Sequence, residues 1–360
     1  MGELKKALFT LGVKKMATLS YRDICKKIKS GEELGGVYVL FGDEDYTKAD
    51  AVSRFRLAAS ESGFAEFNLV RISPTKLSLD ALRESTETPP LMSELKLIEI
   101  DGADLFAAKV KDLEEYAKLL SFTGGDVAVV FHLNSKDKTE KEITASPLYK
   151  LLSKEKYPPV LVNCQKATPS EIHTWLSHRM SALGVLASAE TTAELARRCA
   201  YSMFSLVGEV AKLASYAKSK SRNVILSEDI EKVVSESIEV GAFDLTNAIS
   251  DRRISDALAI YAKMKRLNTP PQMILGSLAA NFATLYKMKL AKDGGMPHES
   301  AAKLFGINEY RARLLYQSLA RCDERYLKRA LTLFSEADAK SKSLNTDGYT
   351  QVELLIASLR

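Results

Sequence analysis

The segment at residues 37–48 (VYVLFGDEDYTK) is the first place where this chain could carry nucleotide chemistry. An apolar strand that ends at a glycine is where many α/β proteins place a phosphate loop, with the spacing G-x-x-x-x-G-K-[ST]. The segment does not match that pattern. Three carboxylates, Asp43, Glu44 and Asp45, stand where a phosphate would lie, and their charge repels an anion. The sequence therefore predicts a degenerate nucleotide site around Gly42. We interpret this segment as the end of a strand followed by a helix cap.

The second half of a nucleotide-hydrolysing site is also missing from the sequence. Such proteins end a later strand in paired acidic residues that hold magnesium and orient water. The apolar segment at residues 127–134 (VAVVFHLN) ends instead in His132, Leu133 and Asn134. Neither a G-x-S-x-G nor an H-E-x-x-H motif occurs in the chain. We therefore expect no catalytic residues and no cofactor, and an enzyme with an unrecognised nucleotide site is the weakest of the function classes.

Residues 88–92 (TPPLM) could act as an apolar anchor. Pro89 and Pro90 end the helix expected before them and stiffen the chain that follows. Leu91 and Met92 are therefore expected at a turn. Such a pair either folds back into a local core or enters a hydrophobic pocket on a partner, and the local sequence leaves both possibilities open.

Residues 300–315 (SAAKLFGINEYRARLL) resemble a helix-turn-helix, with Arg311 and Arg313 on the second helix. A DNA-binding regulator that uses this segment is therefore the alternative function. Reading bases requires several polar side chains on one helix face, and Gln317 is the one further candidate. We favour an ordinary helical hairpin.

Cysteines and histidines form no metal-binding pattern in the sequence. His173 and His178 share an expected helix at a five-residue spacing that does not stack one above the other. We assign no metal ion. The four cysteines are far apart and form no C-x-x-C pair, so we interpret them as buried free thiols: Cys25, Cys164, Cys199 and Cys322.

Composition is that of a globular protein with two or three domains. The chain has 360 residues, of which 46% are hydrophobic and 27% charged. Its formal net charge of +5 is spread along the sequence, which permits contact with nucleic acid without demonstrating it. No apolar run approaches the roughly 20 residues of a membrane span, and the first 15 residues lack a signal peptide. The sequence thus predicts a cytoplasmic protein with no membrane contact.

The first half of the chain alternates strand-like and helix-like segments, which predicts a parallel sheet with crossover helices. Expected strands are at residues 37–41, 69–72, 95–100, 127–131 and 160–162. The pattern changes at residues 168–171 (TPSE), where a capping box and a proline start a helix. From there on every expected element is a helix, and the helices lengthen after residue 240. Those in the last part are expected at residues 254–266, 271–292, 299–305, 309–320, 325–339 and 352–359.

Taken together, these segments resemble the delta subunit family of bacterial DNA polymerase III, the clamp-opening member of the sliding-clamp loader. The resemblance runs from about residue 18 to residue 360. It rests on the order and spacing of several short motifs, namely the strand-Gly-acidic segment 37–44, the run Pro90–Glu94, Trp175, segments 209–216 (EVAKLASY) and 243–249 (FDLTNAI), the helix start at 271–278, and Ala337-Asp338 with Lys342.

The resemblance implies an AAA+-type fold without a functional nucleotide site, in which an α/β domain is followed by all-α domains. Its parts would be an N-terminal extension (1–17), a RecA-like α/β domain (18–164), a small helical lid (165–237) and a helical collar for oligomerisation (238–360). It also implies a non-catalytic subunit that binds the sliding clamp (beta), opens one ring interface and helps to load the ring onto primed DNA. The implied partners are the ATPase subunits (tau/gamma) and delta-prime.

By position, Leu91 and Met92 match the apolar wedge of that family, with Pro89 and Pro90 before it. The family often has phenylalanine in this pair, so this chain departs from the pattern. Leucine and methionine can fill an apolar pocket, but the aromatic contribution is lost, and we expect a lower affinity.

Overall fold

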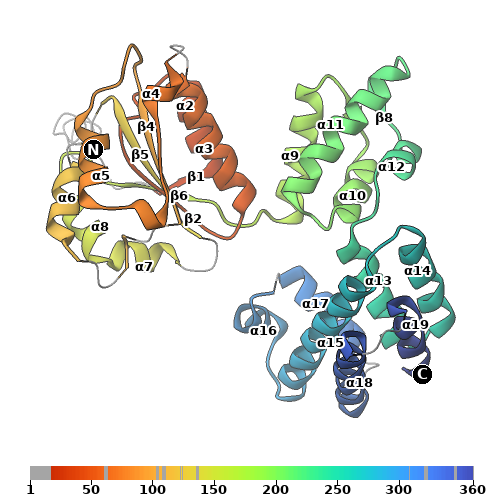
Figure 1. Ribbon diagram of the computed structural model, residues 1–360. Helices are drawn as coiled ribbons and strands as arrows, with labels where there is room; N and C mark the ends of the chain where they lie inside the picture. The colour runs from red at the N-terminus through yellow and green to blue at the C-terminus, as the bar shows by residue number, and fades with distance from the viewer. Residues whose placement is uncertain are drawn as a thin grey trace, which may run out of the picture. The chain divides into compact units, whose positions relative to one another are not determined.

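A parallel β-sheet forms the centre of the first part of the chain (Figure 1). The computed structural model describes residues 18–60, 64–102, 105–107, 111–121, 123, 125–134, 138–307, 309–319, 323–343 and 347–359. It divides into two compact units, Met1–Thr168 and Pro169–Arg360. The predicted N-terminal extension at residues 1–17 lies outside the described residues. The predicted collar and the predicted lid from Pro169 on fall in the second unit, whereas residues 165–168 of the lid fall in the first.

Within the described residues the sheet has the order β1-β6-β2-β5-β4-β3, and every neighbouring pair is parallel. The five predicted strands are all present, with ends within one residue of those expected, whereas β1 was not expected. Their bounds are β1 Thr18–Ser20, β2 Gly36–Phe41, β3 Leu69–Ile72, β4 Lys96–Asp101, β5 Val127–His132 and β6 Val160–Asn163.

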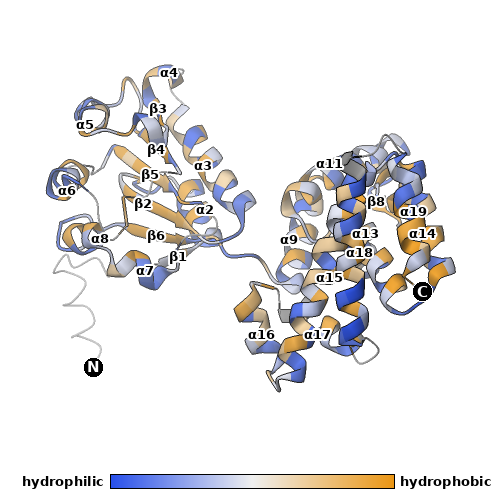
Figure 2. Cartoon of the chain, turned by 60° about the horizontal axis from the view of Figure 1, so that its bottom comes forward, coloured by the Kyte–Doolittle hydropathy of each residue, from blue (hydrophilic) through white to orange (hydrophobic). Residues whose placement is uncertain are grey.

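Strands β2 and β5 are apolar on both faces because both faces of the sheet are covered (Figure 2). Val39 faces one core and the next residue, Leu40, faces the other. Helices α2 and α3 cover one face of the sheet, and α5, α6, α7 and α8 cover the other. Helix bounds in this unit are α2 Tyr21–Lys29, α3 Asp45–Ser60, α4 Ala65–Asn68, η1 Pro74–Lys76, α5 Leu79–Glu87, α6 Leu113–Ser121, α7 Glu140–Ala145 and α8 Pro147–Leu152.

The second unit begins with four helices and a two-stranded parallel sheet, of which the two short strands were not predicted. The Ser188 hydroxyl caps the second of these helices by accepting from the Thr191 N–H. The elements are α9 Pro169–Ala182, β7 Leu186–Ala187, α10 Ala189–Arg198, α11 Met203–Ser219, β8 Val224–Ile225 and α12 Ser227–Val233.

The remaining described helices complete the second unit and share one hydrophobic core. Phe282 and Phe334 meet near its centre, with ring centroids 5.0 Å apart. None of the described helices is both long enough and apolar enough to cross a membrane. The elements are α13 Ile238–Ser250, α14 Ile254–Arg266, α15 Pro271–Asp293, α16 His298–Phe305, α17 Glu309–Ser318, α18 Glu324–Ser343 and α19 Gly348–Ser358.

Candidate functional site

The loop after β2 lies at the carboxyl edge of the sheet, where α/β proteins usually bind ligands. Gly42 has a φ of +115°, and a Cβ there would lie 2.5 Å from the backbone of Cys164. Its close approach is therefore to the end of β6 and not to a phosphate. The Glu44 N–H donates to the Cys164 carbonyl at 2.9 Å, and the Lys166 N–H donates to Asp43 Oδ1 at 2.9 Å. The protein's own groups thus hold this loop.

The amino end of α3 is also occupied by a side chain of the protein. The helix begins at Asp45, and Glu44 Oε1 accepts a hydrogen bond from the Tyr46 N–H at 3.3 Å. Burial raises the pKa of the Glu44 carboxyl. A helix amino end attracts anions because its first N–H groups have no partner within the helix. Here a carboxylate already fills that role.

Lys48 is a residue whose significance the sequence analysis missed. It follows Gly42 by six residues, which is the spacing of a phosphate-loop lysine, but Thr47 replaces the second glycine of the motif. The Lys48 side chain is fully buried. Its ammonium group lies 2.8 Å from Asp45 Oδ1 and donates to the Leu133 carbonyl at 2.9 Å. A lysine that could neutralise a phosphate is therefore paired internally.

The end of β5 carries no acidic pair. His132 lies there, with Nδ1 3.7 Å from Asp101 Oδ1 at the end of β4. Burial and the nearby charge of Lys48 lower the pKa of His132, which keeps the imidazole neutral at pH 7. Asp101 is held by Arg71 at 2.8 Å. Among the described residues, no group of three or more His, Cys, Asp or Glu side chains could hold a metal ion.

The loop before β4 lies at the opposite, amino edge of the sheet. Leu91 and Met92 are 42% and 75% exposed, so the structure places this pair on the surface and not in a local core. Pro89 and Pro90 follow the end of α5 and lead into the pair. The arrangement is that of an exposed apolar tip on a structured domain.

Two buried polar side chains hold this loop, and the sequence analysis singled out neither. Lys96, in β4, is 3% exposed and donates from Nζ to the Thr88 carbonyl at 2.9 Å, just before the two prolines. Asn68, at the end of α4, is fully buried and hydrogen-bonds to the backbone of Leu91. No local pattern could have revealed Asn68, because its partner lies 23 residues further along the chain.

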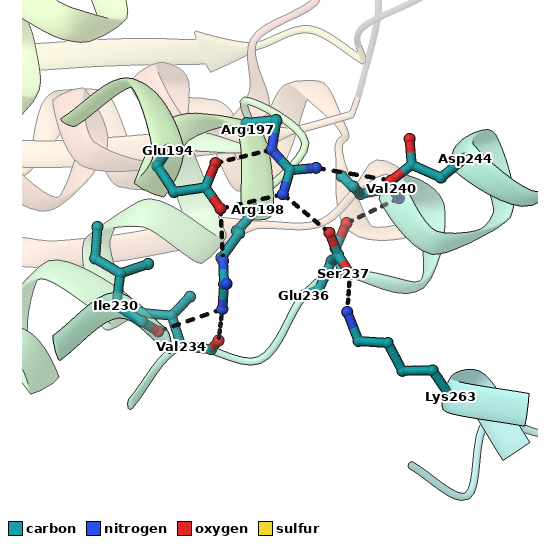
Figure 3. A network of polar contacts seen from close by, with 10 residues as sticks. All are labelled: Glu194, Arg197, Arg198, Ile230, Val234, Glu236, Ser237, Val240, Asp244 and Lys263. Carbon is teal, nitrogen blue, oxygen red and sulfur yellow. Dashed lines mark hydrogen bonds and ion pairs between the residues drawn. The ribbon is translucent and has the colours of Figure 1, made fainter. Parts of the chain in front are cut away.

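An ion-pair network joins the first helices of the second unit to the helices that follow them (Figure 3). Arg197 of α10 lies 2.9 Å from Glu194, 3.2 Å from Glu236 and 3.7 Å from Asp244 of α13. Lys263 of α14 lies 2.7 Å from Glu236. Hydrogen bonds from Arg197 and Arg198 lower the pKa of Glu194 to about 2, because they stabilise the charged carboxylate. The network ties the two groups of helices together at the surface.

The segment that resembles a helix-turn-helix packs as a helical hairpin. Gly306, in the left-handed conformation with φ +65°, ends α16, and Ala312 and Leu315 of α17 are buried in the helical core. The Tyr316 hydroxyl donates to the Met296 carbonyl at 3.0 Å, just before α16, and Lys292 Nζ at the end of α15 donates to the Tyr316 carbonyl at 2.6 Å. Arg313 and Gln317 are exposed, and the side chain of Arg311 lies outside the described residues.

The cysteines follow the prediction in part. Cys164 and Cys199 are buried free thiols, as expected. Cys25 is half-buried, contrary to the expectation, because its neighbour Ile24 takes the position on α2 that faces the core. Cys322 lies outside the described residues.

Comparisons with known proteins agree with this architecture of a parallel α/β domain followed by helical parts. The family model for the delta subunit of DNA polymerase III matches residues 38–165, and the model for the C-terminal domain of that subunit matches residues 239–359. Together the two matches cover more than half of the sequence. The chain belongs to the DNA polymerase III delta subunit family, and the resemblance noted in the sequence is confirmed.

Similarity to Bacillus subtilis delta proteins extends over almost the whole chain. DNA polymerase III subunit delta of strain 168 is 22% identical over 348 residues, covering 94% of this chain and 96% of that protein. The solved structure of the DNA clamp loader delta protein (YqeN) has a TM-score of 0.72 at 22% identity, covering 94% of this chain and 99% of that one. This likeness confirms the predicted fold class, α/β followed by all-α.

Proposed function

We propose that this protein is a non-catalytic subunit of the replicative clamp loader. It binds the sliding clamp (beta), opens one ring interface and helps to load the ring onto primed DNA in the cytoplasm. Its partners in the loader are the ATPase subunits (tau/gamma) and delta-prime. Membership of the delta subunit family supports this function, as does the name of the B. subtilis protein with the similar fold.

The exposed tip of the loop before β4 is the observation that carries the proposal. Leu91 and Met92 project two apolar side chains from a loop held by Lys96 and Asn68. Burying such side chains in a fitted pocket contributes about 1.5 to 3 kcal/mol each. Two anchors of this size can dominate a small interface. Leu91 and Met92 are therefore the clamp-binding wedge, and Pro89 and Pro90 limit the backbone freedom that binding removes.

The carboxyl edge of the sheet supports the non-catalytic part of the proposal. Lys48 is paired with Asp45, and Glu44 caps the helix where a phosphate would bind. A nucleotide would have to displace these carboxylates and leave them close to its own negative charge. The degenerate site of Gly42, Asp43, Glu44 and Asp45 is therefore a structural element, without ATPase activity.

The second unit supplies the assembly function in this proposal. Residues 238–360 form the collar through which the subunits associate, and residues 165–237 form the lid. The network of Arg197, Glu236 and Lys263 ties these two parts together. Residues 169–360 alone should therefore join the loader's other subunits without binding the clamp. A fragment that folds but fails to co-purify with the ATPase subunits would contradict this assignment.

Clamp affinity of a charged wedge variant tests the proposal. Leu91→Asp/Met92→Asp places charges in an apolar pocket, so the affinity for purified clamp should fall at least about 100-fold. The melting temperature should stay nearly unchanged, because exposed side chains support little of the core. The matched control is Leu57→Asp on α3, where an apolar side chain that is 68% exposed lies outside the wedge. Unchanged clamp affinity in the wedge variant, or an equal loss in the control, would refute the wedge.

A further inference from the structure

Both backbone polar groups of Leu91 are bound by one buried side chain. The Leu91 N–H donates to Asn68 Oδ1 at 2.7 Å, and Asn68 Nδ2 donates to the Leu91 carbonyl at 2.9 Å. Leu91 lies outside helices and strands, so regular structure does not satisfy these groups. The amide of Asn68 pairs with the Leu91 backbone as a neighbouring strand would, because it has both a donor and an acceptor.

Asn68 is itself fixed by the sheet. It is the last residue of α4 and directly precedes β3, where Leu69 pairs in register with Leu97 of β4. Its own N–H donates to the Phe64 carbonyl at 3.3 Å, and the residue is fully buried. The amide that holds Leu91 is thus anchored to the strand next to the one that the loop enters.

The backbone of Met92 shows independently that the tip is constrained. Met92 has a φ of +49°, in the left-handed region that a residue with a Cβ rarely adopts. Its side chain is 75% exposed, so side-chain burial contributes little to holding this conformation. The contacts of Asn68 lie one residue earlier and are positioned to hold it.

We propose that Asn68 is the positioning residue of the clamp-binding wedge. It is buried, so it does not touch the clamp and acts through Leu91. By fixing the backbone before binding, it reduces the conformational freedom that the wedge loses when it enters the pocket. This inference rests on the proposed function, since it assigns a role in the same interaction.

Asn68→Ala removes both hydrogen bonds to Leu91 and should lower the affinity of the full chain for purified clamp about tenfold. The matched control is Ser146→Ala in the same unit. Ser146 is 5% exposed and its hydroxyl caps α8, so this change also removes a hydrogen bond of a buried polar side chain. Both variants should melt at lower temperature, but only Asn68→Ala should weaken clamp binding at a temperature where both are folded. Unchanged affinity in the folded Asn68→Ala variant would overturn the inference.

A double-mutant cycle separates positioning from a general structural role. In the Leu91→Ala/Met92→Ala background, Asn68→Ala should have no further effect on clamp affinity, while its effect on melting temperature should persist. An equal loss of affinity in both backgrounds would overturn the role, because Asn68 would then act without the wedge. If clamp affinity survives Leu91→Asp/Met92→Asp, the proposed function fails, and this inference fails with it.

Hydrogen exchange gives a readout that needs neither a variant nor the clamp. The Leu91 amide should exchange slowly for a residue in an exposed loop, because its N–H is bound by a buried acceptor. Exchange at the rate of an unprotected loop amide would overturn the inference, even if Asn68→Ala does not fold.

Discussion

The two edges of the parallel sheet in the first unit differ in the side chains that they expose. At the carboxyl edge, the charged groups of Asp45 and Lys48 are paired with one another. At the amino edge, the backbone of Leu91 is also hydrogen-bonded, but Leu91 and Met92 are exposed. The edge that usually holds a ligand is filled by the protein itself, and the opposite edge presents an apolar surface.

In the proposed function, this difference is the exchange of nucleotide chemistry for binding within one fold. An internal ion pair replaces the ligand's charge, so the sheet keeps its shape without a bound phosphate. A buried lysine without any partner would be costly, which explains why a carboxylate and a carbonyl oxygen accompany Lys48.

The largest expected effect at the carboxyl edge is that of Lys48→Ala. This change leaves a cavity and removes the donor to the buried Leu133 carbonyl, so it should cost about 2 to 4 kcal/mol of stability. Hydrogen exchange of the β2 and β5 amides measures this free energy. Clamp affinity of the folded variant should equal that of the parent, and a large loss would show that the two edges are not independent.

Asp45→Asn should have a smaller effect, about 1 kcal/mol or less, because the Asp45 side chain is 57% exposed and the amide oxygen can still accept from Lys48. The same exchange measurement compares it with Lys48→Ala. A loss as large as that of Lys48→Ala would mean that the charge of Asp45, and not the packing of the lysine, holds this edge.

A still smaller, pH-dependent effect is expected from Glu194→Gln in the second unit. The pKa of Glu194 is about 2 in the folded protein, below its ordinary value of 4.5. The carboxylate therefore stabilises the fold above about pH 4.5, and this contribution is lost as the pH falls towards 2. The variant should be less stable by under about 1 kcal/mol at pH 7, and the difference should vanish in acid. A difference that grows with falling pH would contradict the network.

Magnesium ATP should have no effect at all on the purified chain. At about 1 mM nucleotide, a site of ordinary micromolar affinity would raise the melting temperature, because a ligand that binds the folded state stabilises it. We expect no shift and no hydrolysis. Saturable binding that depends on the residues around Gly42 would contradict the assignment of a filled carboxyl edge.

The sequence predicts the large elements of this fold and misses those that depend on tertiary contacts. The strands β2 to β6 were readable because each is a short, mostly apolar run between helix-length segments. Strand β1 was not, because its three residues include Thr18 and Ser20 and remain largely exposed. The two-residue strands β7 and β8 are too short to show any period.

The sequence predicted the exposed tip of the candidate site but not the buried residues that hold it. The double proline marked Leu91 and Met92, whose role at the clamp stays a prediction. Lys48 was visible at its six-residue distance from Gly42 but was overlooked because Thr47 breaks the motif. Asn68 carried no sequence signal, since its function arises only when strands β3 and β4 come together.

Photocrosslinking in the assembled loader tests the contrast between the two edges most directly. A photoreactive amino acid replaces Met92 at the amino edge in one variant and Asp43 at the carboxyl edge in another. Our account predicts a covalent product with the sliding clamp from position 92 and none from position 43. A clamp product from position 43 with none from position 92 would contradict it.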